Sequence, residues 1–284
     1  MDCSTAILQL ICPDRPGLVS EIAGWVSQHG GNIRHADHHT DDEASLFLSR
    51  IEWDLKGFQI ERASIQHHIR TLADQLSGSA QLNFSDEKAK VAIFVSKQSH
   101  CLLDILWRVR SMELPMEIPL IISNHPDLEP ICKDFGIPFK LIQVKPATKR
   151  ESEKIILDLL KDYNIELIIL AKYMQILSGY FLDNFSSVIN IHHSFLPAFK
   201  GAQPYHRAWE RGVKLIGATA HYVTEELDNG PIIEQTIAHI SHRDEVKDLI
   251  RIGRDTERMA LARAIRLHLR RQVMVYRGRT AVFA

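Results

Sequence analysis

Residues 187–201 read SVINIHHSFLPAFKG, and this stretch decides the fold of the longer, C-terminal part of the chain. Its residues 188–191 are apolar and β-branched except for Asn190, a pattern typical of a strand that enters a buried sheet. His192 and His193 follow where the strand should end. Because side chains alternate along a strand, we expect Asn190 and His192 to share one face and His193 to point the other way.

Asn190 and His192 together have the chemistry needed for reactions at an acyl carbon. An amide can donate a hydrogen bond to an oxyanion, and an imidazole can transfer a proton. Further along, residues 216–223 read IGATAHYV, which predicts a strand of small residues, and Asp228 lies in the turn-rich loop after it. A carboxylate there can fix the tautomer of His192 and stabilise its charged form. From these residues alone, two interpretations remain: a catalytic site, or a pair of polar residues that only satisfy each other's hydrogen bonds at the end of a sheet.

Strand and helix patterns alternate along the chain after residue 90. The predicted strands are 90–96, 118–123, 139–144, 166–171, 188–192, 216–223 and 232–239, and the predicted helices are 101–112, 127–135, 151–163, 204–211 and 244–271. This alternation predicts an α/β fold with a mostly parallel sheet, whose ligand site lies at the carboxyl ends of the strands.

The N-terminal part has a different order of elements. Its predicted strands are 5–12, 32–40, 45–53 and 80–84, and its predicted helices are 18–29 and 59–76. The order βαββαβ is that of a ferredoxin-like split βαβ domain. A polar, charged stretch follows it, so we predict a first domain at 1–85, a linker at 86–90 and a second domain at 91–284.

Composition and charge exclude several classes of function. Over 284 residues, 34 Lys and Arg oppose 35 Asp and Glu, so no overall field favours nucleic acid or a membrane surface. No apolar run reaches membrane length, and the first residues lack the basic segment of a signal peptide. The four cysteines, Cys3, Cys12, Cys101 and Cys132, are scattered, as in a reduced cytoplasmic protein. The 15 histidines show none of the familiar metal spacings, so we predict no metal.

The motifs around the predicted site closely resemble those of the folate-dependent formyltransferase family. The resemblance rests on Asn190-Ile191-His192, Ser194-Phe195-Leu196-Pro197 and the run Gly217-x-Thr219-x-His221-x-Val223-Thr224-Glu225-Glu226-Leu227-Asp228-x-Gly230-Pro231-Ile232. It implies a doubly wound α/β sheet, and it implies that the catalytic residues are Asn190, His192 and Asp228. It also implies that 10-formyltetrahydrofolate is the formyl donor and therefore a substrate, and that no separate cofactor is required.

The same resemblance implies a substrate pocket. Residues 172–178, KYMQILS, are similar to the loop that forms the pterin pocket in the family, although Gln175 stands where members often carry Arg. The implied substrate-binding residues are Met174, Gln175, Ile176, Leu177, Thr224, Glu225 and Leu227. Met174 and Leu177 are equally compatible with a purely structural place in the core.

The turn at 14–19, DRPGLV, gives the first domain its resemblance to an ACT regulatory domain. In that family the turn and the helix start form an amino-acid site between paired domains, which here implies Asp14, Arg15, Gly17, Leu18 and Asn32. A helix N-terminus with free N–H groups suits a carboxylate. We therefore expect a homo-oligomer, a dimer or a tetramer, with glycine or methionine as candidate effectors. The alternative is a domain that only dimerises.

The formyl acceptor distinguishes the branches of the family. Enzymes that formylate glycinamide ribonucleotide carry a Gly-Ser-Asn loop after the first strand, whereas residues 96–101 here read SKQSHC and contain no glycine. Taken over its whole length, the chain is similar to the formyltetrahydrofolate deformylase branch. That branch hydrolyses 10-formyltetrahydrofolate to formate and tetrahydrofolate, which supplies formate for purine biosynthesis and balances the one-carbon pool.

The implied mechanism is attack by water on the formyl carbon. Asn190 and His192 would stabilise the oxyanion, and the sequence leaves open whether His192 or Asp228 takes the first proton. Two alternatives stand beside hydrolysis: a formyltransferase to a small amine, and a non-catalytic sensor of amino acids or folate.

Overall fold

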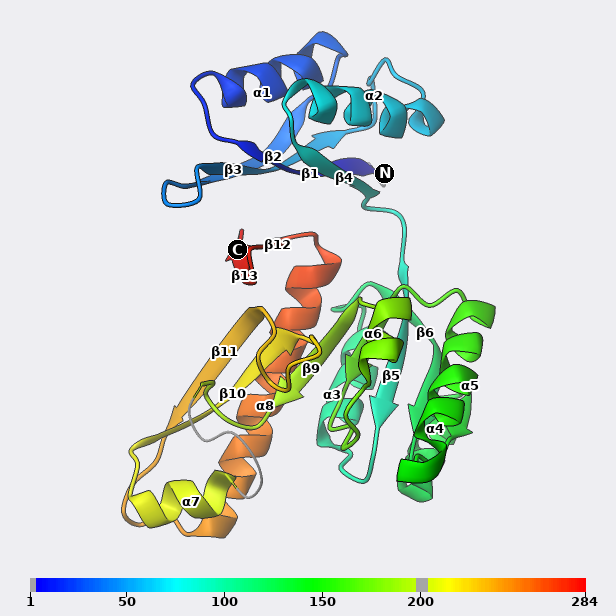
Figure 1. Ribbon diagram of the computed structural model, residues 1–284, viewed down its shortest axis with the longest axis vertical. Helices are drawn as coiled ribbons and strands as arrows, with labels where there is room; N and C mark the ends of the chain where they lie inside the picture. Colours follow the sequence, from blue (N-terminus) through cyan, green and yellow to red (C-terminus); the bar gives the residue numbers. More distant parts are fainter. Residues whose placement is uncertain (1–3, 198–203) are drawn as a thin grey trace. The chain divides into compact units, whose positions relative to one another are not determined.

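The computed structural model describes residues 4–197 and 204–284 (Figure 1). Cys3 and the end of the opening stretch, 198–201, lie outside the described residues. The chain forms two compact units. The first contains the chain up to Lys88 together with Arg270–Tyr276 and Ala281–Ala284, and the second contains Ala89–Leu269 and Arg277–Thr280.

The first unit has the predicted βαββαβ order. Its elements are β1 (Thr5–Pro13), α1 (Leu18–Gln28), β2 (Ile33–Asp41), β3 (Leu46–Asp54), α2 (Arg62–Gln75) and β4 (Ser79–Phe84). The strands form an antiparallel sheet in the order β2-β3-β1-β4. Both helices cover one face of this sheet (Figure 1).

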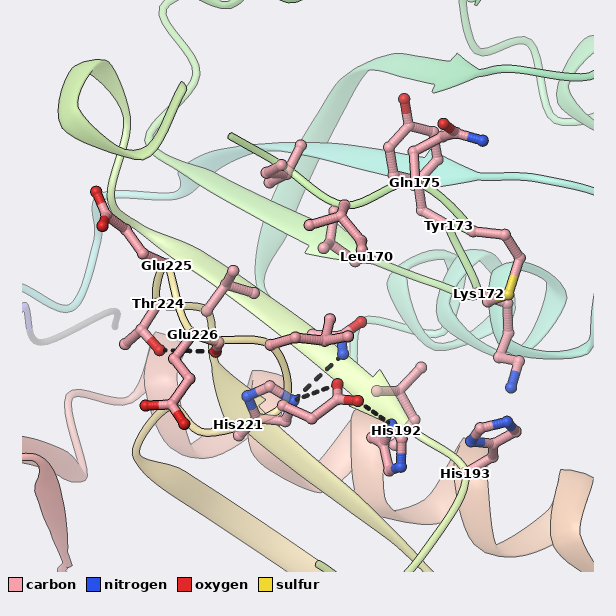
Figure 2. A pocket seen from close by; sticks show the side chains of 18 residues that line it. Leu170, Lys172, Tyr173, Gln175, His192, His193, His221, Thr224, Glu225 and Glu226 are labelled. Atoms are coloured by element: carbon pink, nitrogen blue, oxygen red, sulfur yellow. Dashed lines mark hydrogen bonds and ion pairs between the residues drawn. The ribbon is translucent and has the colours of Figure 1, made fainter. Parts of the chain in front are cut away.

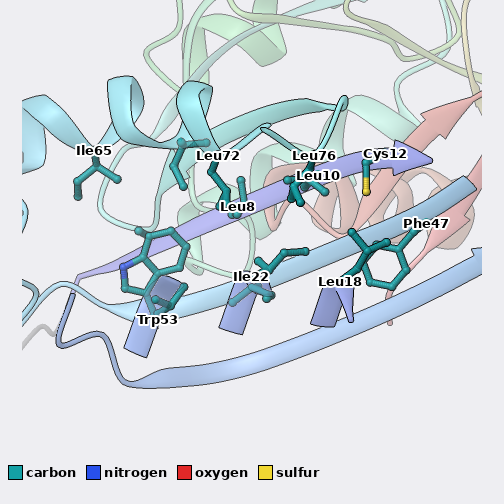
Figure 3. Close-up of a cluster of buried hydrophobic side chains, with 14 residues drawn as sticks. Leu8, Leu10, Cys12, Leu18, Ile22, Phe47, Trp53, Ile65, Leu72 and Leu76 are labelled. Carbon is teal, nitrogen blue, oxygen red and sulfur yellow. The ribbon is translucent and has the colours of Figure 1, made fainter. Parts of the chain in front are cut away.

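The core of the first unit follows from strand alternation. Every second residue of β1, such as Leu8, Leu10 and Cys12, faces the helices and is buried against residues such as Ile22 and Ile65 (Figure 3). The intervening residues of β1 point to the opposite face of the sheet.

C-terminal residues cover that opposite face. Met274, Tyr276 and Ala281 form a buried cluster with Leu48, and Ile11, Leu46 and Phe283 pack against it. Arg50, which is 4% exposed, donates hydrogen bonds to the carbonyl oxygens of Arg270 and Arg271. Burial of the apolar side chains on the second face of the sheet explains why residues 270–276 and 281–284 belong to the first unit.

The C-terminal cover is a hairpin that the sequence analysis did not predict. The last helix, α8, spans Val246–Leu269 and ends before the predicted Arg271. It is followed by β12 (Val273–Tyr276) and β13 (Arg279–Val282), which pair with each other. Arg277 and Gly278 between them both have positive φ, 46° and 74°, as a tight hairpin turn requires.

The second unit is the predicted doubly wound α/β domain. Its strands are β5 (Ala89–Val95), β6 (Met116–Ser123), β7 (Phe139–Leu141), β8 (Leu167–Leu170), β9 (Val188–His192), β10 (Leu215–Tyr222) and β11 (Ile232–His239). They form one sheet in the order β11-β10-β9-β8-β5-β6-β7. Strands β5 to β9 are parallel, whereas β10 and β11 each run antiparallel to their neighbour.

The helices of this unit lie against the sheet (Figure 1). They are α3 (His100–Arg110), α4 (Glu129–Asp134), α5 (Lys149–Asp162), α6 (Gly179–Asn184), α7 (Pro204–Arg211) and α8. The short α6 was not predicted. It begins where the Ser178 hydroxyl accepts a hydrogen bond from the Phe181 N–H. Within the described residues, none of the helices combines the length and apolar character needed to cross a membrane.

Candidate active site

The predicted site residues meet at the end of β9, between β8 and β10. The register pairs Asn190 with Leu170 on β8 and with His221 on β10, and it pairs His192 with Thr219. Because β9 has a neighbour on each side, its side chains are held in fixed positions. The pocket beside it is lined by residues of four segments: Leu170 and Lys172–Leu177, Asn190–His193, His221, and Val223–Asp228 (Figure 2).

His192 and Asp228 form the centre of the site. The Nδ1 atom of His192 lies 3.1 Å from Oδ2 of Asp228. A carboxylate can only accept, so Nδ1 carries a proton and the lone pair of a neutral ring is on Nε2. This Nε2 atom is buried and has no hydrogen-bond partner among the described residues. His192 therefore presents an unused polar atom that can act as a base or, once protonated, as a donor.

The loop after β10 holds Asp228 against the histidines. Asp228 has a positive φ of 54°, and the loop returns close to the strand at Gly230. A Cβ atom at Gly230 would lie 1.7 Å from the Tyr222 carbonyl oxygen, so only glycine allows this approach. Burial raises the pKa of the Asp228 carboxyl, but the hydrogen bond from His192, together with the nearby His221 ring, outweighs burial and holds this pKa below its usual range. Asp228 is therefore an anion at neutral pH.

His221 is a site residue to which the sequence analysis gave no role. Its Nδ1 lies 2.8 Å from the Tyr222 carbonyl oxygen, so Nδ1 must be the donor. Its Nε2 then accepts from the Asn190 amide nitrogen at 3.3 Å and lies 3.7 Å from Oδ1 of Asp228. This contact fixes which end of the Asn190 amide is the donor end. The signal in the sequence was the place of His221 in the family motif at 217–232.

The predicted pterin loop is fixed by buried polar groups. Ser96 Oγ accepts a hydrogen bond from the Met174 N–H at 2.9 Å. Glu153, which is 3% exposed, accepts from the N–H and the hydroxyl of Ser178. The backbone of the loop is therefore tied to β5 and to α5, which gives it a fixed shape before substrate arrives.

The predicted substrate-binding residues all line this pocket, with different exposures. Met174, Ile176 and Leu227 are 62%, 58% and 57% exposed, which is unusual for large apolar side chains and leaves them available to a ligand. Leu177 is 7% exposed and belongs to the hydrophobic core, so its place is in the core, as the alternative to substrate binding predicted. Gln175, Thr224 and Glu225 contribute polar atoms to the lining.

The expectation that His193 points away from the site is wrong. Strand β9 ends at His192, so alternation does not extend to His193. Its ring lies 4.8 Å from the His192 ring, at an interplanar angle of 88°, and it lines the same pocket (Figure 2). Burial and the neighbouring Lys172 and His192 lower the pKa of His193 to about 4, so this imidazole is neutral at pH 7.

A buried cluster of charged and polar groups lies behind Lys172. Glu257 of α8 is 2% exposed, and its Oε2 lies 2.6 Å from His100 Nε2. Its Oε1 lies 3.3 Å from Lys172 Nζ and accepts from the Tyr205 hydroxyl at 2.9 Å. Burial raises the pKa of Glu257, but these partners outweigh it and lower the pKa to about 2.

The same cluster contains one trio with metal-ligand chemistry among the described residues. Ligand atoms of His100, Cys101 and Glu257 all lie within 4.8 Å of one another. Burial raises the pKa of the Cys101 thiol well above its usual range, so it is not a thiolate. Lys172 already neutralises Glu257, and an ammonium this close opposes a second cation. The trio is therefore better described as part of a hydrogen-bond and ion-pair network within the protein than as a metal site.

Four of the predicted effector residues, Asp14, Arg15, Gly17 and Leu18, lie at the start of α1. The expectation that Asn32 joins them is wrong, because Asn32 follows the C-terminal end of α1 and lies beside Asp54, at the opposite end of β1. Gly17 has φ of 91° and precedes the helix, whereas the Leu18 side chain is buried in the core. Arg15 forms two short hydrogen bonds with Glu21, at 2.6 and 2.7 Å. The Asn32 side-chain amide donates a hydrogen bond to Asp54. Asp14 donates its N–H to the Ser45 carbonyl oxygen.

Fold and site together define a class of enzyme that joins an ACT domain to a formyl transferase domain. A model of the ACT domain matches residues 6–66, and a model of the formyl transferase family matches residues 89–265. The chain is 57% identical over 280 residues to the formyltetrahydrofolate deformylase of Synechocystis, and the match covers 99% of each protein. The chain belongs to the formyltetrahydrofolate deformylase family.

Solved structures agree with this assignment. The formyltetrahydrofolate deformylase of Pseudomonas syringae superposes with a TM-score of 0.96 at 40% identity, covering 100% of this chain and 96% of that one. The glycinamide ribonucleotide transformylase 1 of Symbiobacterium toebii superposes with a TM-score of 0.65 at 29% identity, covering 72% of this chain and 98% of that one. The transferase fold is thus shared, and the full-length likeness is with deformylases.

Proposed function

We propose that this protein hydrolyses 10-formyltetrahydrofolate to formate and tetrahydrofolate. The observation that carries the proposal is the arrangement of Asn190, His192 and Asp228 in the wall of one pocket, beside the fixed loop at 172–178. The pterin would bind along this loop and along residues 223–227, with its formyl group directed at His192. Full-length likeness to deformylases supports water as the acceptor.

The catalytic cycle can be assigned to these side chains. Water attacks the formyl carbon and gives one proton to His192 Nε2, while the Asn190 amide donates a hydrogen bond to the oxyanion. The C–N10 bond then breaks, and His192 returns the proton to N10. The products are tetrahydrofolate and formic acid, which ionises to formate. The lowered pKa of Asp228 makes it a poor base, so its role is to orient His192 and stabilise the imidazolium.

The decisive test is formate release from 10-formyltetrahydrofolate with no acceptor present. We expect one formate and one tetrahydrofolate for each substrate consumed, in many turnovers per enzyme. Absence of turnover would leave the non-catalytic sensor as the better description. The structural likeness to a glycinamide ribonucleotide transformylase keeps an amine acceptor as the second candidate. Adding glycinamide ribonucleotide tests that candidate, because a transferase would convert it to its formyl derivative at the expense of formate.

We further propose that the ACT domain pairs with that of another copy and binds glycine or methionine. Control by an amino acid suits an enzyme that consumes formyltetrahydrofolate, since unregulated hydrolysis would drain the pool from which purines are made. The proposed setting is the cytoplasm, in agreement with three buried, unpaired cysteines, Cys12, Cys101 and Cys132.

A further inference from the structure

One end of the pocket is a wall formed by Lys172 and His193. Lys172 and His193 line the pocket, and the Lys172 ammonium lies on the same side of His192 as His193, away from Thr224 and Glu225 (Figure 2). If the folate occupies the part near 173–177 and 223–227, this end is where the second reactant must stand. The inference therefore rests on the proposed function and concerns the choice of acceptor.

The cluster behind the wall holds the Lys172 ammonium in place. Lys172 is 5% exposed, and its Nζ lies 3.3 Å from Oε1 of Glu257, so the buried charge has an opposite charge beside it. Oε2 of Glu257 lies 2.6 Å from His100 Nε2, and Oε1 also accepts from the Tyr205 hydroxyl, so the position of the carboxylate is fixed as well.

The cluster is also shaped to keep Tyr205 in place. A Cβ atom at Gly253, one turn before Glu257 on α8, would lie 2.1 Å from the Tyr205 hydroxyl oxygen. Only a glycine at that position leaves room for the ring. The Tyr205 ring centroid lies 6.2 Å from that of His193, so the same side chain supports both members of the wall.

We propose that the Lys172 ammonium, held by Glu257, His100 and Tyr205, binds the attacking water and thereby makes water, not an amine, the formyl acceptor. An ammonium has three donors and no acceptor, and Glu257 needs only one of the three. Water has two lone pairs, so one can accept from Lys172 while the other attacks the formyl carbon.

An amine has no equivalent option. A neutral amine has one lone pair, and a molecule that uses it to accept from Lys172 cannot attack. A protonated amine has no lone pair and meets a like charge in a site of low dielectric. In hydrolysis the new bond is C–O, the C–N10 bond breaks, and the proton lost by water ends on N10. The Lys172 donor therefore favours that reaction over formation of a new C–N bond.

The test is the division of the formyl group between water and glycinamide, measured as formate and N-formylglycinamide. In the wild type we expect a formylglycinamide-to-formate ratio far below that of the uncatalysed reaction with the same mixture. In the double variant Lys172→Met/Glu257→Gln, which removes both charges and leaves no buried ion unpaired, the ratio should rise about tenfold or more, the usual worth of one hydrogen bond to a charged group.

The formylglycinamide-to-formate ratio distinguishes a change in the choice of acceptor from a general loss of activity. A purely structural defect lowers both products together and leaves the ratio unchanged. The control is Lys247→Met/Glu245→Gln, which removes an exposed ion pair of the same kind, and its ratio should equal that of the wild type. An unchanged ratio in a folded Lys172 double variant would overturn the proposal. If that variant does not fold, a wild-type ratio equal to the uncatalysed one overturns it instead. Formate release without any amine, measured first, tests the proposed function separately.

Discussion

The Nδ1 atom of His192, at the end of β9, lies 3.1 Å from Oδ2 of Asp228, in the loop after β10. Two segments well separated in sequence are joined here, and the join depends on Gly230, which lets the loop approach the Tyr222 carbonyl oxygen. The contact leaves His192 Nε2 as the reactive nitrogen. Most of the chemistry proposed for this protein depends on that one arrangement.

Replacing Asp228 tests the arrangement directly. Asp228→Asn keeps the shape of the side chain but removes its charge, and its amide can present a donor to His192 Nδ1, which favours the wrong tautomer. We expect turnover to fall by about 10²–10⁴, the range for loss of general acid–base catalysis, with folate binding retained. The assay is formate release, with binding measured by fluorescence. Asp158→Asn, at an exposed position on α5, is the control. Near-normal turnover of Asp228→Asn would contradict the proposed mechanism.

His221 should matter through Asn190 rather than by proton transfer. His221→Phe fills the same space but offers no acceptor to the Asn190 amide. The amide is then free to turn, so kcat should fall about tenfold or more, below the ~10²–10³ cost of deleting an oxyanion donor. KM should change little, because the pterin loop is untouched. The exposed His239→Phe serves as the control. A change confined to KM would show that His221 contacts substrate instead.

Glu153 should affect substrate binding without taking part in the chemistry. It ties the Ser178 end of the pterin loop to α5. Glu153→Gln weakens this tie because one carboxylate acceptor becomes a donor, so KM should rise several-fold, in line with the ~1–3 kcal/mol cost of an unmet buried polar group, while kcat falls less. Glu151→Gln, exposed on the same helix, should match the wild type. Equal losses in kcat and kcat/KM would place Glu153 in the chemical step.

The pKa of His193 predicts how stability depends on pH. Its folded pKa of about 4 lies below the ordinary value of about 6.5, so between these values the unfolded chain binds more protons. Stability from this group is present above pH ~6.5 and is lost as the pH falls toward 4. The carboxyls of Asp228 and Glu257 also have lowered pKa values, and their contribution is lost only below about pH 4. Calorimetric Tm values between pH 4 and 7 should therefore decrease less steeply for His193→Asn than for the wild type, and parallel curves would count against a buried neutral His193.

Local signals in the sequence were sufficient for the strands and for part of the site. The apolar run at 188–191 predicted β9, and the turn residues after 223 predicted the loop that carries Asp228. The role of His221 could not be predicted in the same way, because it depends on the antiparallel pairing of β10 with β9. The contact between Lys172 and Glu257 joins the segment after β8 to α8, and the periodicity of the sequence cannot predict a contact between two such distant elements.

Two errors have simpler causes. His193 was assigned by alternation, although the strand ends one residue earlier. The hairpin at 273–282 does have a local signal, because Arg277-Gly278 between the β-rich runs VMVY and RTAV is typical of a hairpin turn. Its position against β1 and β3 of the first unit is a tertiary effect. Leu48 and Ile11 lie on the face of the sheet opposite α1 and α2, and the hairpin buries them there.

The last prediction concerns control by the ACT domain. We expect glycine or methionine to bind with its carboxylate at the N–H groups of the first turn of α1, next to Gly17. The measurement is a titration of formate release and of oligomer mass against each amino acid. A coupling of about 1–3 kcal/mol, or 5–150-fold in affinity, is typical of such control.

Deleting the domain is a poor test, because Met274 and Tyr276 would lose the core residue Leu48. Point variants of the full chain are preferable. Gly17→Ala should abolish the response, since a side chain at φ 91° forces the turn to change. Gly57→Ala imposes similar backbone strain, at φ 86°, in the same unit and with open space around it, so it should keep the response. If neither amino acid changes turnover or mass in the wild type, the domain serves assembly alone.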